Sequence, residues 1–221
     1  MDRFAVLTEL ATRISEMGLA HPVCVAIDGV DAAGKTILAE ELGSHIKSKN
    51  REVIRASIDG FHNPASIRYA RGALSPEGYY NDSFNYDALV QHLLLPLGSN
   101  GSREYAPRVF DYRTDTAVAH ELSVADRDAV LLFDGVFLLR PELREYWDYT
   151  VFVDAAFEVT LLRALHRDLP LFGSEKDVRR RYEQRYVPGQ KIYLRQCNPK
   201  QAADAIVDNN DVAQPSIFFR W

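Results

Sequence analysis

Five short, largely apolar runs divide the chain, and each is followed by a polar or glycine-containing turn. The runs cover residues 23–28, 52–58, 129–133, 149–153 and 205–207. Apolar runs of this length are typical of strands that are buried on both faces of a parallel sheet. The sequence therefore predicts a sheet built from at least these five strands.

Between the runs, apolar residues recur with the spacing of helices. This spacing predicts helices over residues 4–18, 37–47, 85–97 and 156–168, with a charged stretch at 170–186 before Val187-Pro188-Gly189. Residues 61–84, rich in Pro, Gly, Tyr and Asn, predict a loop with a short helix near 64–70, and residues 103–111 predict a pair of short strands. Strands that alternate with helices indicate a single α/β domain over 1–221, with a mostly parallel, doubly wound sheet covered by helices on both faces.

Composition narrows the class of protein. The chain has 221 residues, 47% of them hydrophobic, and a formal net charge of −5, so it can bury a full core and shows no sign of a nucleic-acid partner. Cys24 and Cys197 have no metal-ligand or disulfide spacing, and Cys24 is expected to be buried in the first strand. No run has the length of a membrane span and the N-terminal segment does not resemble a signal peptide, so we expect a cytoplasmic protein.

Residues 29–36 match the complete phosphate-binding pattern G-x-x-x-x-G-K-[ST]. The residues are Gly29-Val30-Asp31-Ala32-Ala33-Gly34-Lys35-Thr36, between a predicted strand and a predicted helix. In this P-loop the backbone N–H groups face phosphate oxygens, the lysine reaches the β- and γ-phosphates, and the threonine hydroxyl can bind Mg²⁺. The alternative, a chance match in a Gly/Ala-rich turn, is disfavoured by the flanking strand and helix. ATP and Mg²⁺ are the expected ligands.

Three carboxylates follow predicted strands, where ligands bind in open α/β sheets. Asp134 after Leu131-Leu132-Phe133 has the Walker-B arrangement and is expected to hold Mg²⁺, unless it only caps a turn with Gly135. Asp59 is expected to accept a proton from an attacking hydroxyl, orient it or bind the metal, unless it only forms an Asp-Gly turn. Asp154 is expected to cap the helix that follows it.

Other P-loop classes fit less well than a small-molecule kinase. The chain lacks the guanine-reading Asn-Lys-x-Asp of GTPases and the Leu-Ser-Gly-Gly-Gln of ABC transporters, and it is short for a motor. Residues 163–186 carry many arginines, so they are expected to form an Arg-rich lid that closes over the reactants and excludes water.

The order of motifs resembles the uridine kinase/phosphoribulokinase/pantothenate kinase family, and is most similar to its uridine kinase branch. After the P-loop come Asp59-Gly60-Phe61-His62, Tyr79-Tyr80-Asn81-Asp82-Ser83-Phe84-Asn85-Tyr86-Asp87, Val109-Phe110-Asp111-Tyr112, Leu132-Phe133-Asp134-Gly135, Arg163-x-x-x-Arg167-Asp168 and Ala203-Asp204-Ala205-Ile206-Val207. The similarity extends from about residue 22 to 212. It implies ATP-dependent phosphorylation of a primary hydroxyl, in uridine kinases the 5′-OH of uridine or cytidine.

The resemblance also implies roles for individual residues. Asp59 would be the catalytic base, and Thr36, Asp59 and Asp134 would surround Mg²⁺. Arg163 and Arg167 would stabilise charge on the transferred phosphoryl group or hold the lid closed, unless they lie on a solvated helix face. The adenine base is expected near Asp208-Asn209-Asn210.

The chain also departs from uridine kinases. Position 134 is Asp rather than Glu, no base-reading His follows Asp111, the lid has no Arg-Gly-Arg, and Asp59-Gly60-Phe61 is closer to pantothenate kinases. Because of these departures, the sequence does not identify the molecule that accepts the phosphoryl group.

Residues 61–84 are the expected acceptor region. Its candidate substrate contacts, together with one later tyrosine, are His62, Arg68, Tyr79 and Tyr112. Each has a simpler alternative, since a loop histidine is often only polar surface and paired tyrosines often only pack. Arg68 and Arg71 would matter for an anionic acceptor such as pantothenate.

Three functions remain open. The acceptor is expected to be a small molecule, with a pyrimidine nucleoside first and pantothenate or another small alcohol second. The third is a regulator that binds ATP without an acceptor, which the intact Lys35, Thr36, Asp59 and Asp134 disfavour. A homo-oligomer is compatible with the sequence.

Overall fold

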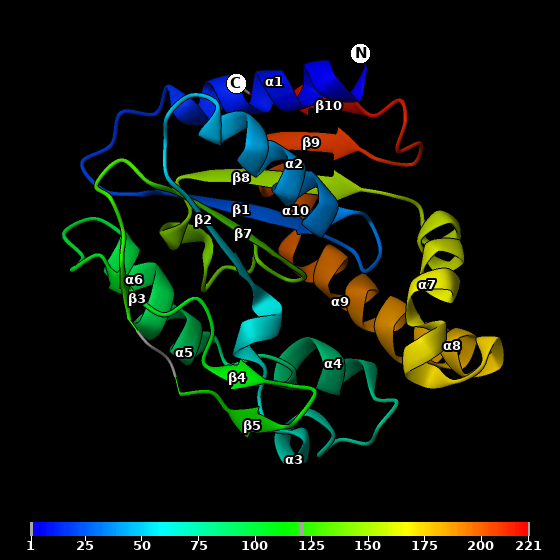
Figure 1. Cartoon of the computed structure of the whole chain (residues 1–221). Helices are drawn as coiled ribbons and strands as arrows, with labels where there is room; N and C mark the ends of the chain where they lie inside the picture. The colour runs from blue at the N-terminus through cyan, green and yellow to red at the C-terminus, as the bar shows by residue number, and fades with distance from the viewer. Residues whose placement is uncertain (1, 120–121, 221) are drawn as a thin grey trace.

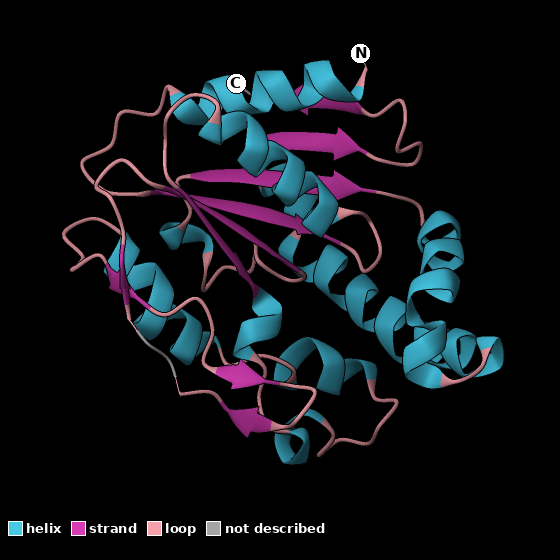
Figure 2. Ribbon diagram, in the orientation of Figure 1, coloured by secondary structure: helices cyan, strands magenta, loops and turns pink. Residues whose placement is uncertain are grey.

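Six strands form the central sheet in the order β10-β9-β8-β1-β7-β2 (Figures 1 and 2). Their bounds are β1 Val23–Gly29, β2 Val53–Ser57, β7 Val130–Gly135, β8 Tyr149–Asp154, β9 Ala205–Asp208 and β10 Ser216–Phe219. The five strands from β9 to β2 pair in parallel, and only β10 runs antiparallel, against β9. The computed structural model describes residues 2–119 and 122–220. The predicted α/β fold with a mostly parallel sheet is confirmed.

Two further pairs of very short strands lie outside this sheet. β3 (Glu104–Tyr105) pairs with β6 (Ser123–Val124), and β4 (Phe110–Asp111) pairs with β5 (Thr116–Ala117). The predicted strands within 103–111 therefore exist, but they pair with later segments and not with each other.

Helices cover both faces of the sheet (Figure 1). One face is covered by α1 (Arg3–Ser15) and α2 (Lys35–Lys47), and the other by α4 (Pro76–Asp82), α5 (Tyr86–Leu89), α6 (Leu95–Leu97) and α9 (Val187–Cys197). Alternate residues of β1 serve the two cores: Val23, Val25 and Ile27 pack with α1 and α2, whereas Cys24 and Ala26 pack on the opposite side. Strand β1 is buried at every position, which explains its continuous apolar run.

The remaining helices and helical turns are distributed along the chain between the elements already described. They are the 3₁₀ turn η1 (Ile58–Phe61), α3 (Ala65–Arg68), the π-helical turn η2 (Val90–Leu94), η3 (Arg144–Tyr146), α7 (Phe157–Phe172), α8 (Glu175–Arg181), the π-helical turn η4 (Tyr182–Tyr186) and α10 (Pro199–Ala202). None of the helices in the described part of the chain is both long and apolar enough to cross a membrane.

Several predicted boundaries were wrong. The charged stretch 170–186 is not a separating loop, because α7 continues through Pro170 to Phe172, and α8 and η4 then lead into α9. A serine cap begins α8: Ser174 Oγ accepts a hydrogen bond from the Asp177 N–H at 3.1 Å. The sequence analysis also missed β10.

The helix cap predicted at Asp154 was wrong. Ala156 is the N-cap of α7 and offers no side-chain hydrogen bond. Asp154 instead ends β8, and its carboxylate accepts a hydrogen bond from Lys200 Nζ at 2.6 Å. An ion pair with α10 therefore replaces the expected cap. The burial predicted for Cys24 is confirmed.

Helix α2 is expected to tolerate substitution very differently on its two faces. Leu42 is fully buried between α2 and the sheet, so Leu42→Ala should lower the free energy of unfolding by about 2–5 kcal/mol. Ile37 lies on the same helix with 57% of its surface exposed, so Ile37→Ala should change it by less than about 0.5 kcal/mol. Urea denaturation followed by circular dichroism measures both, and equal losses would contradict the assignment of faces.

Candidate active site

The P-loop joins β1 to α2 and depends on two residues with left-handed backbone. Ala32 has φ +57° and Gly34 has φ +100°, and Gly34 caps the N-terminus of α2. A Cβ on Gly34 would lie 2.5 Å from Asn209 Nδ2 in the turn after β9, and this contact, together with the positive φ, disfavours a side chain there. This geometry leaves the first N–H groups of α2 at the open end of the loop, where an anion binds favourably.

The end of β9 and helix α7 hold the P-loop from outside. Asn209 Nδ2 donates to the Ala33 carbonyl at 2.7 Å. Arg163 Nη2 donates to the carbonyls of Asn209 and Asn210 at 2.8 and 3.0 Å, and its Nη1 donates to the Ala33 carbonyl at 3.4 Å. Arg163 thus contacts the back of the loop and is not among the residues that line the cavity beside it.

Lys35 is almost fully buried at the start of α2. Its Nζ donates to the Val30 carbonyl at 2.8 Å. Burial lowers the pKa of Lys35, while the carboxylates of Asp31, Asp28 and Asp134 oppose this shift. The ammonium therefore lies within a set of acidic groups that keep a positive charge in the loop.

Thr36 and Asp134 meet because β1 and β7 are neighbours in the sheet. The Thr36 hydroxyl donates to Asp134 Oδ2 at 2.7 Å. Arg55, on the adjoining β2, donates from Nη2 to Asp134 Oδ1 at 2.8 Å and from Nη1 to the Leu132 carbonyl at 2.8 Å. The pairing with Arg55 orients the carboxylate so that its other oxygen faces the P-loop.

Asp59 lies in η1, directly after β2, and lines the same cavity as Lys35, Thr36 and Asp134. Asp59 is exposed to solvent through the open cavity. Desolvation by the surrounding protein raises the pKa of Asp59; His62 opposes the rise, and the charges of Asp31 and Asp134 add to it. A carboxylate with a raised pKa is a better proton acceptor than an ordinary aspartate.

Asp31 connects the P-loop to two distant helices. Tyr79 of α4 donates its hydroxyl to Asp31 Oδ2 at 2.6 Å, and Gln190 of α9 donates from Nε2 to the same oxygen at 2.8 Å. Gln190 Oε1 accepts in return from the Asp31 N–H at 3.2 Å. Helices α4 and α9 are thereby tied directly to the P-loop.

An aromatic wall flanks His62 on the acceptor side. The His62 ring lies 4.6 Å from the ring of Phe84 and 4.8 Å from that of Tyr112, between ring centroids. Burial lowers the pKa of His62, while the Asp59 carboxylate opposes the shift, so the imidazole is neutral near pH 7. Its Nδ1 lies 3.1 Å from the Asp59 carbonyl oxygen. A neutral imidazole beside the proposed base can hydrogen-bond a substrate hydroxyl.

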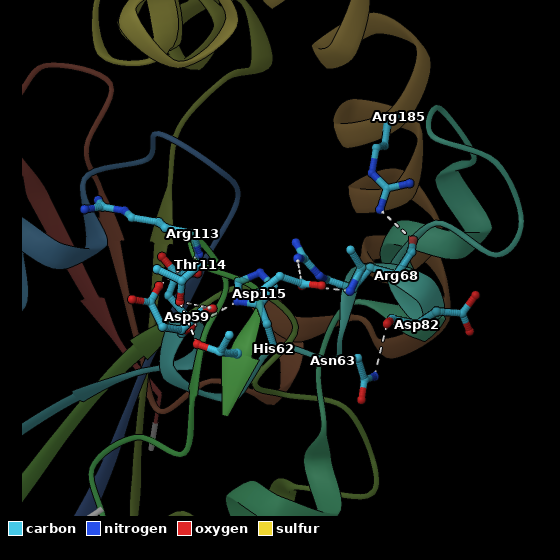
Figure 3. Close-up of polar contacts among 12 residues, drawn as sticks. Asp59, His62, Asn63, Arg68, Asp82, Arg113, Thr114, Asp115 and Arg185 are labelled. Carbon is cyan, nitrogen blue, oxygen red and sulfur yellow. Dashed lines mark hydrogen bonds and ion pairs between the residues drawn. The ribbon is translucent and has the colours of Figure 1, made fainter. Parts of the chain in front are cut away.

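Arginines differ sharply in their surroundings. Arg68 and Arg185 are buried and line the cavity, and Arg68 donates to Asp115 Oδ1 at 2.8 Å (Figure 3). Arg71 lies outside the cavity lining, with 57% of its side chain exposed and an ion pair to Asp82. Of the two arginines suggested for an anionic acceptor, only Arg68 therefore faces the cavity.

The α7–α8 segment contributes a second group of polar residues. Arg167 donates from Nε and Nη2 to the two oxygens of Asp168 at 2.6 and 3.0 Å, and Tyr182 donates its hydroxyl to Asp168 at 2.8 Å. All three residues line the cavity. Unlike Arg163, four residues earlier, Arg167 therefore lines the cavity.

The cavity has a volume of about 560 Å³ and brings together most of the expected site residues. It is lined by Asp31, Lys35, Thr36, Asp59, His62, Arg68, Tyr79, Tyr112, Asp134 and Arg167, among others. Sequence analysis missed the partners Arg55, Gln190 and Asp168-Tyr182 as functional groups. Arg55 offered a weak signal, as a charged residue within a strand of the parallel sheet, whereas Gln190 offered none.

The donors present fit Mg²⁺, which takes oxygen ligands and usually keeps water and substrate phosphates in its shell. Thr36 supplies a hydroxyl oxygen, and Asp134 and Asp59 supply carboxylate oxygens on the same cavity. Within residues 2–119 and 122–220, no cluster of three His, Cys, Asp or Glu side chains forms a metal cage. The three oxygen donors of Thr36, Asp134 and Asp59 suit a metal that is held jointly by protein and nucleotide.

Comparison with known proteins identifies relatives of this chain. Residues 24–214 match the model of the phosphoribulokinase/uridine kinase family. The uridine kinase of Halalkalibacterium halodurans is 28% identical over 150 residues, which cover 67% of this chain and 68% of that protein. Uridine-cytidine kinase B of Dictyostelium discoideum is 26% identical over 189 residues, covering 85% and 74%.

Solved structures support the same fold. A structure described as that of a possible uridine kinase from Bacillus stearothermophilus has a TM-score of 0.71 at 21% identity and covers 92% of this chain and 98% of its own. D-glycerate 3-kinase from Cryptococcus neoformans has a TM-score of 0.55 at 12% identity, covering 98% of each chain. With a P-loop, a neighbouring Asp134 and a family match over most of its length, the chain belongs to the phosphoribulokinase/uridine kinase family of P-loop kinases.

Proposed function

We propose that this chain transfers the γ-phosphoryl group of ATP to a hydroxyl of a small molecule. The observation that carries the proposal is one cavity shared by Lys35, by the hydrogen-bonded pair Thr36 and Asp134, and by Asp59. These are the groups that phosphoryl transfer requires, namely a phosphate-binding cation, oxygen ligands for Mg²⁺ and a carboxylate for the attacking hydroxyl.

Each residue has a defined task in this proposal. The P-loop N–H groups and Lys35 bind the β- and γ-phosphates, with Lys35 exchanging its bond to the Val30 carbonyl for phosphate oxygens. Thr36, Asp134 and Asp59 hold Mg²⁺, which neutralises phosphate charge when bound. Asp59 orients the acceptor hydroxyl and accepts its proton. Arg167 faces the transferred group with a planar guanidinium.

Residues 163–186 are proposed as the lid. Cavity-lining residues of this segment include Arg167, Asp168 and Phe172 from α7 and Tyr182 from the start of η4. Closure of this segment would exclude water that competes with the acceptor. Arg163, which binds the backs of the P-loop and of the 208–210 turn, would keep the phosphate site aligned, and that turn would lie beside the adenine.

The acceptor proposed first is the 5′-OH of a pyrimidine nucleoside, because the relatives at 26–28% identity are named uridine or uridine-cytidine kinases. His62, Tyr79 and Tyr112 supply rings and polar groups on that side of the cavity. Pantothenate or another small alcohol is the second candidate, favoured by the buried Arg68 in the cavity wall.

An acceptor panel tests the proposed reaction. ADP release, measured by a coupled assay with ATP and Mg²⁺, should rise at least about tenfold over background with one member of a panel of nucleosides, pantothenate and sugars. Tight ATP binding without stimulation by any acceptor would instead favour the ATP-binding regulator.

Substitutions of Lys35 and Asp59 should separate ATP binding from the chemical step. Lys35→Ala should reduce turnover to undetectable levels, because the γ-phosphate loses its principal cation. Asp59→Asn should lower kcat by about 10²–10⁴-fold while the Kd for ATP stays within about twofold, because the amide cannot accept the proton but keeps an oxygen that can bind Mg²⁺. Stopped-flow turnover and calorimetry measure the two effects. Near-normal turnover of Asp59→Asn would reject the assigned base.

The pH dependence of kcat/KM should also identify Asp59 as the base. Turnover requires ionised Asp59, so kcat/KM for Mg·ATP, which reports the enzyme before the metal binds, should fall as pH decreases through a pKa that is higher than that of an ordinary aspartate. In His62→Gln this acid limb should remain and lie at the same or a higher pH, since His62 lowers the pKa of Asp59. Loss of the limb in His62→Gln would assign it to the imidazole instead.

A further inference from the structure

We infer that the acceptor carries a negatively charged group, a carboxylate or a phosphate ester, which is bound by Arg68 and Arg185 at the end of the cavity remote from the P-loop. The inference rests on the proposed function, since it takes the cavity to be the acceptor site. It favours the second acceptor class proposed above, pantothenate or another small alcohol that carries a negative charge, over a neutral pyrimidine nucleoside.

Arg185 is a buried cation without an acidic partner. Only 3% of its surface is exposed, and its guanidinium donates to the main-chain carbonyls of Ser75 and Arg68 at 3.1 and 3.2 Å (Figure 3). Among the residues that the structure describes, no carboxylate pairs with it. Buried charges are normally paired, so this guanidinium favours an anion supplied by a ligand.

Arg68 has unused hydrogen-bonding capacity at the same place. Its side chain is 9% exposed and donates from Nη2 to Asp115, but its buried Nε has no hydrogen-bond partner among the described residues. Asp115 is 40% exposed, so solvent already screens part of this pair. Of the two buried guanidinium groups, only that of Arg68 thus has a carboxylate partner, which leaves an excess positive charge in this part of the cavity wall.

The pair lies apart from the phosphate-binding residues. Tyr79 lies between them: its hydroxyl bonds to Asp31 of the P-loop, and the Arg185 guanidinium carbon lies 5.6 Å from its ring centroid. Along the other wall, His62 interacts electrostatically with Asp59 and with Arg68, and Figure 3 shows it between these two residues. A molecule whose hydroxyl meets Asp59 would therefore extend past His62 toward the two arginines.

The nucleotide phosphates already have cations of their own. Lys35 and the helix N-terminus belong to the P-loop, and Arg167 faces the cavity from α7. Arg68 and Arg185 are thus available to the acceptor. The competing explanation is that Arg185 has only a structural role. In that role its hydrogen bonds to the carbonyls of Ser75 and Arg68 would hold η4 against this part of the chain.

Binding of matched neutral and anionic probes distinguishes these explanations. Calorimetric titrations would use the full chain saturated with Mg²⁺ and a non-hydrolysable ATP analogue, so that the phosphate site is filled. The pairs are glycerol with D-glycerate or glycerol 3-phosphate, pantothenol with pantothenate, and uridine with orotidine. We expect an anionic member of at least one pair to bind at least about tenfold more tightly than its neutral partner. Comparison of the carboxylate probes with the phosphate-ester probe shows which of the two anionic groups the arginines bind.

Substitutions of Arg68 and Arg185 test whether these residues cause the tighter binding of anionic probes. Arg68→Gln and Arg185→Gln should each weaken binding of the anionic probe about tenfold or more and leave the neutral probe within about twofold. Arg185→Lys, which keeps the charge, should retain part of the preference if Arg185→Gln fails to fold. Arg71→Gln, three residues from Arg68 but outside the cavity lining, is the matched control and should behave as wild type.

Three outcomes would overturn the inference. They are equal or tighter binding of every neutral probe, an equal loss of neutral and anionic probes in the arginine variants, and no binding of any anionic probe. These are binding results and do not depend on turnover. Failure of the proposed function would instead appear as anion binding without any acceptor-stimulated ADP release.

Discussion

The hydrogen bond between Thr36 and Asp134 is the contact on which the site depends. Thr36 follows β1 and Asp134 is part of β7, and the two strands are adjacent and parallel in the middle of the sheet. Parallel pairing brings both carboxyl ends to the same edge, so one hydrogen bond joins the P-loop to the Walker-B carboxylate. Arg55 reaches the same carboxylate from β2, the next strand.

The rest of the phosphate site is supported from the other side of β1. Strand β8 pairs with β1, and β9 ends in the turn where Asn209 binds the Ala33 carbonyl. The left-handed Gly34 allows Asn209 to approach closely, because a Cβ there would lie 2.5 Å from Asn209 Nδ2. Strand order, not local sequence alone, therefore determines the shape of the loop.

Two helices that are distant in sequence meet at the P-loop. Helix α4 supplies Tyr79 and helix α9 supplies Gln190, and both bond to Asp31 of the P-loop. A displacement of α4 would therefore also change the surroundings of Asp31.

Prediction from sequence succeeded where chemistry is local. The strands, the P-loop and the carboxylates at strand ends follow from apolar runs and from short motifs with defined geometry. It failed at Asp154, because the ion pair with Lys200 of α10, which is 46 residues away, replaced a local cap. It also failed at 170–186, where packing of Val178 and Tyr182 against Ala164 and Leu165 stabilises helix in a stretch that is polar by composition.

The sequence by itself determined that this chain binds nucleotide phosphates on a parallel α/β sheet, since a P-loop needs only contiguous residues between a strand and a helix. Tertiary structure alone decided which side chains share the cavity. Arg163 and Arg167 are one helical turn apart, yet only Arg167 lines it, because the two face different neighbours. Likewise, Arg68 and Arg185 are 117 residues apart and meet only in the folded chain, and their unbalanced charge cannot be seen in any linear motif.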